Sequence, residues 1–541
     1  MSDKTNIVQT IKLSQFTHAL IESYTLTKPK GRPDDISKLT VSQTVSFFGI
    51  LYEKVRNAVE YSEDHLIRKA AIERIIKRRF SINPSGKNEA ENLLRELLWA
   101  RYFDDGSLGG DDVNQIQEII DKYLKLKQLI TAGRPVEEKS YLYQFIIDLL
   151  TCEIEENLNP EGSTREASFT FFVYQVLRRK IKIEGVSDDK KDAFFLAAIE
   201  KAYRRSDRSY QRFHLFITFY NKIQRYSDNE LIALSSKLPE IFNKIDQMLN
   251  NQFVDKLVRF TKKHLPPFLT LFDIIKSKKP PNNQLTVITD KTSLWNVVDQ
   301  TCRDKYQSIG LRLRNLAIKS FIYIFLTKML FALILEYPVS KLIDGEVNNS
   351  SILINSLFPP FLMLLILAFF RLPGEDNTRK IYSRIIEIID ASKSFETRVA
   401  FMPKATPSKR PILIFGFTIF YSLTFIITLL IIYELLLYLN FNLVSQVVFI
   451  FFLSIITFFS YRIKQIVNEY RLEEKESIFS PIIDFFFMPV LSLGKFFSSE
   501  LAKLNFFIVI FDFIIEAPFK FLFEIIEEWI SFVKKRKEEI I

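Results

Sequence analysis

The chain has 541 residues, of which only 14 are glycine and 52 are phenylalanine. Glycine at well under half of its average share of roughly 7% disfavours folds built on glycine-rich turns or phosphate loops. The formal net charge is +10, and nearly all charge-free stretches follow residue 320. Two cysteines and four widely spaced histidines exclude a disulfide framework or a multi-cysteine metal cluster, so we predict no metal and no cofactor. The composition predicts a water-soluble first half joined to a membrane-embedded second half.

Residues 1–275 are predicted to form an all-α cytosolic domain of about ten helices. Two segments, Ser163–Glu166 and Ser227–Glu230, match the capping box, in which a serine and a glutamate satisfy free amides at a helix start. Ser187 precedes two acids, which favours another helix start, and Gly133-Arg134-Pro135 separates two further helices. The acidic pair after Gly109-Gly110 resembles a fragment of a calcium loop, but a turn that leads into a helix explains it better.

From residue 276 the chain is predicted to lead towards the membrane. The segment KSKKPPNNQ contains two adjacent prolines, which end helices, so we expect a linker over 276–292. Within it, Leu285–Thr289 is the one segment that we predict to be a short strand. A membrane-proximal helix is expected over 293–316.

Four segments then have the length and apolarity of membrane spans. A bilayer core of about 30 Å needs about 20 mostly uncharged helical residues. We predict spans at 317–335, 351–370, 411–433 and 441–461. The first is the weakest because it carries Lys319 and Lys328.

The distribution of basic residues predicts how these spans are oriented. Nine Lys and Arg residues lie in the loop 371–410, whereas the loop 336–350 holds one and the turn at Asn440 holds none. Because short basic loops stay on the cytoplasmic side, four crossings with both termini in the cytosol satisfy every loop. The opening residues MSDKTNIVQT lack the apolar core of a secretory signal, which agrees with a cytosolic N-terminus.

The segment 462–541 is predicted to be a cytosolic tail with interfacial amphipathic helices. Charged residues from Asp512 to Glu528 recur every four positions, which places them on one helix face opposite an apolar face. A fifth span is the rival interpretation, but it would place Asp512 and Glu516 in hydrocarbon. The apolar segment Ile482–Leu493 is too short to cross and is expected to dip into the membrane or lie flat on it.

The span segments contain one candidate polar site. Lys328 lies mid-span, where a lysine is costly to bury. Glu336 lies eight residues further on, about 12 Å along the helix and too far for a direct pair, whereas Glu434 on a neighbouring helix could pair with the lysine. Pro359 and Pro360 are predicted to kink the second span and expose carbonyls near Asn355, at a similar depth to Lys328. Snorkelling of the lysine and simple packing of the proline kink are the interpretations that we favour.

Clusters of basic residues form the second group of candidates. They could contact anionic lipid headgroups or phosphate, and those between Tyr203 and His214 alternate with the aromatic residues Tyr210 and Phe213. We rank a solvated or internally paired role first, headgroups second and nucleic acid a distant third. The residues are Arg178, Arg179, Lys180, Arg204, Arg205, Arg208, Arg212, Lys534, Lys535, Arg536 and Lys537.

Three functions remain open. The first is a membrane-anchored interaction or scaffold protein that presents the helical domain to protein partners. The second is a transporter or channel subunit that uses the Lys328 region and, with only four spans, forms a homo-oligomer. The third is a membrane-embedded enzyme acting on lipid-linked substrates, for which only the scattered acids Glu434, Asp484 and Asp512 argue. The sequence matches none of the short phosphate-loop, dinucleotide, metalloprotease or hydrolase motifs, which favours a role without catalysis.

Overall fold

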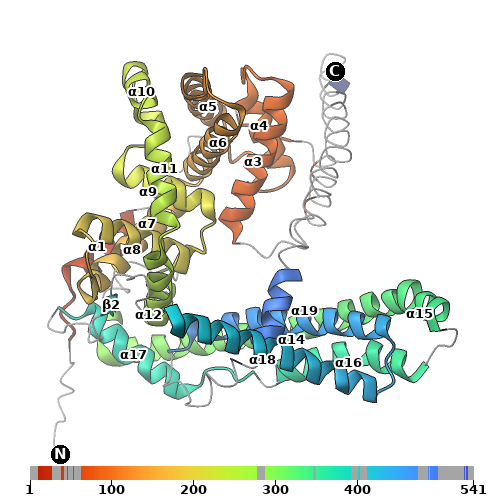
Figure 1. Ribbon diagram of the computed structural model, residues 1–541. Coiled ribbons are helices and arrows are strands. Elements are labelled where there is room, and N and C mark those ends of the chain that lie inside the picture. The colour runs from red at the N-terminus through yellow and green to blue at the C-terminus, as the bar shows by residue number, and fades with distance from the viewer. Residues whose placement is uncertain are drawn as a thin grey trace, which may run out of the picture. The chain divides into compact units, whose positions relative to one another are not determined.

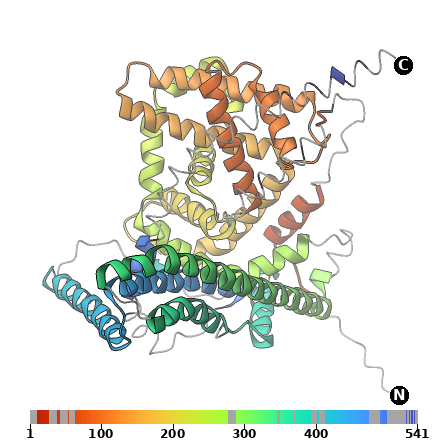
Figure 2. The same ribbon diagram turned by 90° about the vertical axis from the view of Figure 1, so that its right-hand side faces the viewer.

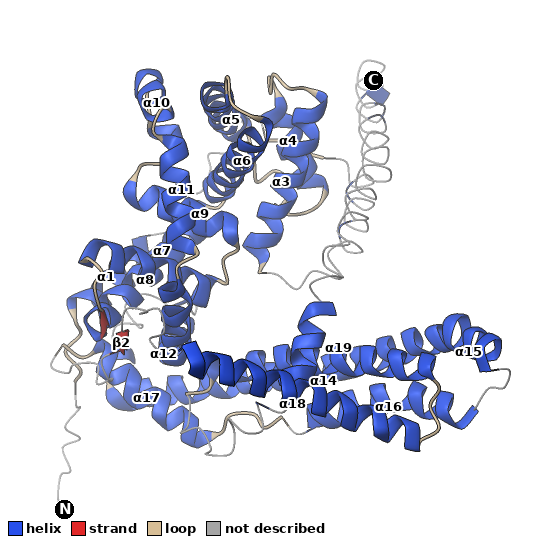
Figure 3. Cartoon of the chain, viewed as in Figure 1, coloured by secondary structure: helices blue, strands red, loops and turns tan. Residues whose placement is uncertain are grey.

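The computed structural model is almost entirely helical in the part of the chain that it describes, which confirms the all-α class (Figures 1 and 3). The described residues are 10–26, 38–41, 46, 53, 63–276, 287–344, 349–368, 370–391, 400–402, 411–472, 485, 488–497, 525, 529, 532–533 and 536. Contacts divide the chain into two compact units. We call them the α6 unit (13–262, 394–402 and 513–541) and the span unit (1–12, 263–393 and 403–512). The division falls inside a helix at Lys262, earlier than the domain end that we predicted at 275.

The α6 unit is a helical assembly with its own hydrophobic core. Its helices are α1 (Gln15–Leu26), α3 (Asp64–Ile82), α4 (Glu89–Trp99), α5 (Gly110–Thr131), α6 (Val136–Leu158), α7 (Pro160–Leu177), α8 (Asp188–Ile199), α9 (Arg208–Phe219), α10 (Asp228–Ser235), α11 (Leu238–Leu249) and the first part of α12 (Gln252–Lys276). Short turns lie at η1 (Arg178–Lys180), η2 (Glu200–Arg204) and η3 (Ile223–Arg225).

Helix α6 lies at the centre of this unit. Every residue from Phe145 to Glu156 is buried, because α3, α5, α7, α9 and α11 all pack against it. A helix that is covered on all sides normally carries apolar residues throughout. Phe145 follows that rule and stacks on Phe242 of α11 with ring centroids 3.8 Å apart. Four carboxylates of α6 break the rule, and they are described with the candidate sites below.

Several predicted helix starts can be compared with the structure. Ser227 and Glu230 form the predicted capping box at α10, and Asp112 accepts a hydrogen bond from the Gly109 N–H at the start of α5. The capping box predicted at Ser163 is wrong, because α7 already begins at Pro160. Proline suits the first helical position, where its missing N–H would have no partner, so it sets the start before Ser163 is reached.

Two short strands occur among the described residues. β1 (Ile181–Ile183) pairs in parallel with β2 (Ala400–Met402), with Ile181 opposite Ala400. The strand predicted at Leu285–Thr289 is wrong, since residues 287–289 are helical and residues 285–286 lie outside the described part. A short apolar run has no periodicity that separates strand from helix, which explains the error.

The span unit holds four helices that are long and apolar enough to cross a membrane, and this confirms the predicted number. Its elements are α14 (Lys291–Phe331), η4 (Ala332–Glu336), α15 (Tyr337–Asp344), α16 (Asn349–Ala368), α17 (Glu375–Ile389), α18 (Pro411–Tyr438), α19 (Leu443–Val467) and η5 (Asn468–Tyr470). The predicted membrane-proximal helix and first span are one continuous helix, the long green helix of Figure 2.

Close packing joins three of the four candidate spans, whereas α18 is largely exposed. α14, α16 and α19 lie side by side, and Met363 and Ile456 are buried between them. A shorter apolar helix over 488–497 packs against α19. A Cβ on Gly494 would stand 2.1 Å from the Ser454 carbonyl oxygen, so this contact requires glycine.

Candidate functional sites: a polar cluster among the spans and an ionic network around α6

A buried ion pair lies within the first candidate span. The side chains of Lys328 and Glu336 have no exposed surface, and Lys328 Nζ lies 3.5 Å from Glu336 Oε2. The partner suggested by the sequence, Glu434, is exposed on α18 and forms no ion pair among the described contacts. The sequence argument counted only the backbone rise between positions 328 and 336. It neglected that two long side chains can extend towards each other across the intervening π-turn η4.

Two further helices supply the other partners of Glu336. Its Oε1 accepts hydrogen bonds from Asn355 Nδ2 on α16, at 2.7 Å, and from Ser445 Oγ on α19. Asn355 Nδ2 also donates to the Ser445 carbonyl oxygen at 3.1 Å. Lys328 Nζ lies 5.0 Å from the ring centre of Phe452, where the ring face attracts a cation. The cluster therefore links α14 and η4 with α16 and α19.

Some polar atoms of this region have no hydrogen-bond partner in the described structure. They are Asn355 Oδ1, Ser356 Oγ and Ser340 Oγ, all buried. The orientation of the Asn355 amide is fixed, because the Glu336 carboxylate and the Ser445 carbonyl oxygen can only accept. Oδ1 must therefore point away from both. A buried acceptor without a donor costs about 1–3 kcal/mol, so a water molecule or another donor at this atom would be favourable.

The cluster lies near one end of the helices. Asn355 is six residues after the start of α16 and Ser445 is two after the start of α19, about 9 Å and 3 Å of helical rise. Pro359 and Pro360 are buried in α16, which continues through them without interruption. They share the buried stripe of α16 with Asn355 and Met363, as expected of residues that pack.

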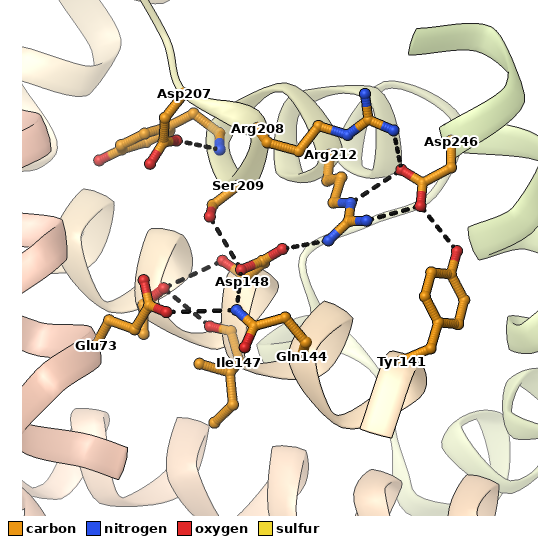
Figure 4. Close-up of polar contacts among 12 residues, drawn as sticks. Glu73, Tyr141, Gln144, Ile147, Asp148, Asp207, Arg208, Ser209, Arg212 and Asp246 are labelled. Carbon is orange, nitrogen blue, oxygen red and sulfur yellow. Dashed lines mark hydrogen bonds and ion pairs between the residues drawn. The ribbon is translucent and has the colours of Figure 1, made fainter. Parts of the chain in front are cut away.

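A second set of polar contacts surrounds helix α6, whose carboxylates were not among the predicted site residues, although Arg204, Arg208 and Arg212 were. Asp148 accepts hydrogen bonds from Ser209 and Gln144 and pairs with Arg212 at 2.6 Å (Figure 4). Arg212 also pairs with Asp246 on α11 at 2.7 Å. Asp246 accepts further hydrogen bonds from Arg208 and Tyr141, which closes the network (Figure 4).

The remaining carboxylates of α6 tie it to other elements. Glu155 pairs with Arg68 of α3 at 2.6 Å and accepts a hydrogen bond from Tyr210 of α9 at 2.7 Å. Glu153 accepts from the Ile223 N–H of η3 at 3.1 Å and from Tyr123 of α5 at 2.7 Å. One buried helix thus presents carboxylates to α3, α5, α9 and η3, and each carboxylate has donors that offset its burial.

His214 forms the most strongly charged part of this network. Its ring nitrogens lie 3.0 Å from Glu156 and 3.1 Å from Glu200. Burial lowers the pKa of His214, and so does the Arg204 guanidinium 3.0 Å from Nε2, but the two carboxylates outweigh both and raise the pKa to about 9. Glu200, buried but facing His214 and Arg204, has its pKa lowered to about 2. The imidazole is therefore a cation at neutral pH.

The arginines of this unit that we considered as lipid or phosphate contacts are mostly engaged internally. Arg204 and Arg212 are nearly buried and pair with carboxylates, so neither can reach a headgroup without breaking the core. The exposed residues Arg205 and Arg178 pair with Glu63 and Asp192, respectively. Arg208, paired with Asp246, is half-buried. Arg179 is exposed and Lys180 is half-buried.

The predicted tail site falls mostly outside the described residues. Lys534, Lys535 and Lys537 lie outside the described residues, as do Asp484 and Asp512, while Arg536 is helical and exposed. Four apolar residues of the predicted amphipathic helix are also helical and exposed. They are Ile525, Trp529, Phe532 and Val533.

Neither a search for metal-binding groups nor a comparison with known proteins assigns a function to these sites. Within the described ranges, no three His, Cys, Asp or Glu side chains are grouped to hold a metal ion. No protein-family model, curated protein or solved structure matches this chain.

Proposed function

We propose that this chain is a multi-pass integral membrane protein that holds a helical interaction module, the α6 unit, at the membrane surface. The observation that supports this proposal is the presence, in one chain, of four candidate spans and a separate unit with its own core. The carboxylates of α6 fix the neighbouring helices in defined positions, which gives a partner a surface of constant shape. The polar cluster around Glu336 serves in this proposal as a joint that fixes the packing of three spans.

The proposed topology places both termini and the loop 371–410 in the cytosol, as the positive-inside rule requires. It can be tested in sealed cells with a membrane-impermeant maleimide. Both native cysteines, Cys152 and Cys302, are buried, so they add little background labelling. We expect Glu346→Cys to be labelled from outside and Lys380→Cys to be labelled only after permeabilisation. The reverse pattern would contradict this orientation.

The scaffold role predicts that partner binding does not depend on the charges of Lys328 and Glu336 in the candidate spans. In the double variant Lys328→Met/Glu336→Gln the module should remain folded, membrane-bound and associated with the same proteins in a membrane pull-down. Gln at position 336 retains an acceptor for Asn355 and Ser445, so the joint keeps its hydrogen bonds. Partner loss from this inserted and folded variant would contradict a simple anchor.

The unpartnered atoms Asn355 Oδ1 and Ser356 Oγ favour a second candidate, a transporter or channel subunit. Polar groups that face no protein partner inside a membrane commonly line an ion or substrate pathway. Four spans enclose little space, so this candidate requires a homo-oligomer. It predicts that the same double variant abolishes flux in reconstituted vesicles, and that crosslinking in native membranes yields more than a monomer.

A further inference from the structure

A cavity of about 770 Å³ opens in the span unit beyond the end of two candidate spans. It is lined by residues 370–377, which connect α16 to α17 and begin α17, and by five residues at and just beyond the end of α19: Lys464, Val467, Asn468, Arg471 and Leu472. The candidate spans themselves end at Ala368 and Ser460. Tyr306 of α14 supports this connection, because its hydroxyl accepts a hydrogen bond from Asn377 at 2.7 Å.

The position of the cavity matches the depth of lipid headgroups. Lys464 lies four residues beyond Ser460 on the same helix, which is about 6 Å of rise. Arg371 follows Ala368 by three residues. The headgroup region extends roughly 5–8 Å from the hydrocarbon on each side. Both basic side chains therefore begin where the hydrocarbon ends.

Three cations line the cavity without a carboxylate partner among the described residues: Arg371, Lys464 and Arg471. Arg471 Nη2 donates to the Arg371 carbonyl oxygen at 2.7 Å, which holds these two residues together. Two acids, Glu375 and Asp376, also line the cavity, but Glu375 is paired with Arg379 at 2.7 Å. Among the described lining residues, three cations therefore stand against one further carboxylate, Asp376, which leaves a surplus of positive charge.

The first turn of α17 adds backbone donors to the same cavity. Its N-cap is Gly374, which has no side chain to cap the helix, and nothing lies within 4 Å of the place where a Cβ would stand. The N–H groups of Asn377 and Thr378 bond to the Gly374 carbonyl oxygen. The N–H groups of Glu375 and Asp376 have no acceptor within the helix. Asn377 holds this turn in place, because its side chain also bonds to the Tyr470 carbonyl oxygen at 2.7 Å.

We infer that this cavity binds a phosphate group, with Arg371, Lys464 and Arg471 as the cationic contacts and the start of α17 as the backbone contact. Arginine and lysine combined with free helix N–H groups are the usual means by which proteins hold phosphate. The headgroup depth assigns the phosphate to an anionic membrane lipid. The assignment to a membrane lipid rests on the proposed spans, whereas the inference that the cavity binds a phosphate group does not.

Two sets of variants test the site in the full chain purified in neutral detergent. Gly374→Asp places a carboxylate where the phosphate would lie. The backbone at Gly374 has a φ of −120°, which any residue adopts, and aspartate is a favourable N-cap, so this variant should fold at least as well as the wild type. Arg371→Gln/Lys464→Gln removes two cations. The matched control Arg312→Gln/Arg314→Gln removes two exposed cations of α14 that do not line the cavity.

Binding is measured by titrating phosphatidylglycerol, with phosphatidylcholine as the neutral reference, and separately inorganic phosphate. We expect Arg371→Gln/Lys464→Gln to weaken phosphatidylglycerol binding about thirtyfold and the α14 control to change it less than threefold. Gly374→Asp should abolish binding while it leaves the melting temperature unchanged or higher. Saturable binding of inorganic phosphate that is lost in the same variants would also support the site, and would identify a soluble phosphate as its source if lipid has no effect.

Equal losses in the cavity variants and the α14 control would overturn the inference, because they would show only general attraction to charge. Full binding by Gly374→Asp would overturn it as well. The inorganic phosphate measurement needs no bilayer, so it can succeed even if the proposed topology fails.

Discussion

The ion pair between Lys328 and Glu336 allows a quantitative test of how the spans pack. Changing Lys328 to Met keeps most of the side-chain volume but leaves Glu336 buried without its cation. Both side chains have no exposed surface, and the carboxylate would retain only the donors from Asn355 and Ser445. Removing one partner of a buried pair typically costs about 3–5 kcal/mol, whereas replacing both by neutral groups is often neutral or stabilising. We expect Lys328→Met to lose about 3–5 kcal/mol and Lys328→Met/Glu336→Gln to recover to within about 1 kcal/mol of the wild type.

The assay is reversible unfolding of the purified protein in mixed micelles with increasing dodecyl sulfate, followed by far-UV circular dichroism. Glu336→Gln alone should also be destabilised, since it leaves the Lys328 cation buried. The four proteins form a double-mutant cycle, in which a coupling energy of several kcal/mol demonstrates the pair. If Lys328→Met is as stable as the wild type, or if the second change adds a further loss, the two side chains do not form the pair described here.

Three further predictions concern other contacts. Arg212→Gln should destabilise the protein by about 3 kcal/mol because it leaves a buried carboxylate without its ion pair. Arg178→Gln should cost under about 1 kcal/mol, because the Arg178 side chain is 43% exposed in its ion pair. Both values are measured by thermal unfolding of the variants beside the wild type. The pKa of His214 rises from 6.5 in the unfolded chain to about 9 in the folded protein, so protonated His214 stabilises the folded state by about 3 kcal/mol. This stabilisation is fully present below pH 6.5 and is lost as the pH rises through 9. Melting temperatures measured from pH 6 to pH 9.5 should fall in the wild type and much less in His214→Gln; parallel curves would contradict the assignment. Gly494→Ala should lower the melting temperature in detergent, because the new Cβ would meet a backbone oxygen of α19. The control Gly416→Ala has open space around the new Cβ and should leave the melting temperature unchanged or raise it. Equal effects of the two substitutions would mean that the 488–497 helix does not pack against α19 as described.

Sequence reasoning succeeded where one physical term dominates. Hydrocarbon excludes charge so strongly that four apolar runs of sufficient length revealed the four candidate spans. Local hydrogen bonding similarly revealed the start of α10, where Ser227 and Glu230 are only three residues apart. Ser163 failed as a start because a competing signal, Pro160, lies three residues upstream.

The polar contacts depended on tertiary packing, which local patterns do not specify. Glu336 was placed outside the membrane as a loop residue, yet the helix continues through it to Asp344. The carboxylates of α6 were overlooked because charged residues in a helix usually indicate a solvated face. A signal was present: at about 100° per residue, Asp148 and Glu155 lie on one side of the helix, whereas Glu153 lies about 140° around the axis from Asp148, beside Leu149 and Leu150. Acids that are spread around a helix in this way indicate partners on several sides.

The continuity of α14 and the elements that follow it has a mechanical consequence. A helix of 41 residues is about 62 Å long, twice the thickness of the hydrocarbon layer, so in the proposed topology roughly half of α14 projects from the bilayer. Without an intervening loop, the projecting half and the inserted half tilt as one rod. In that topology, a force applied near Trp295 would be transmitted along the helix directly to its lipid-embedded residues.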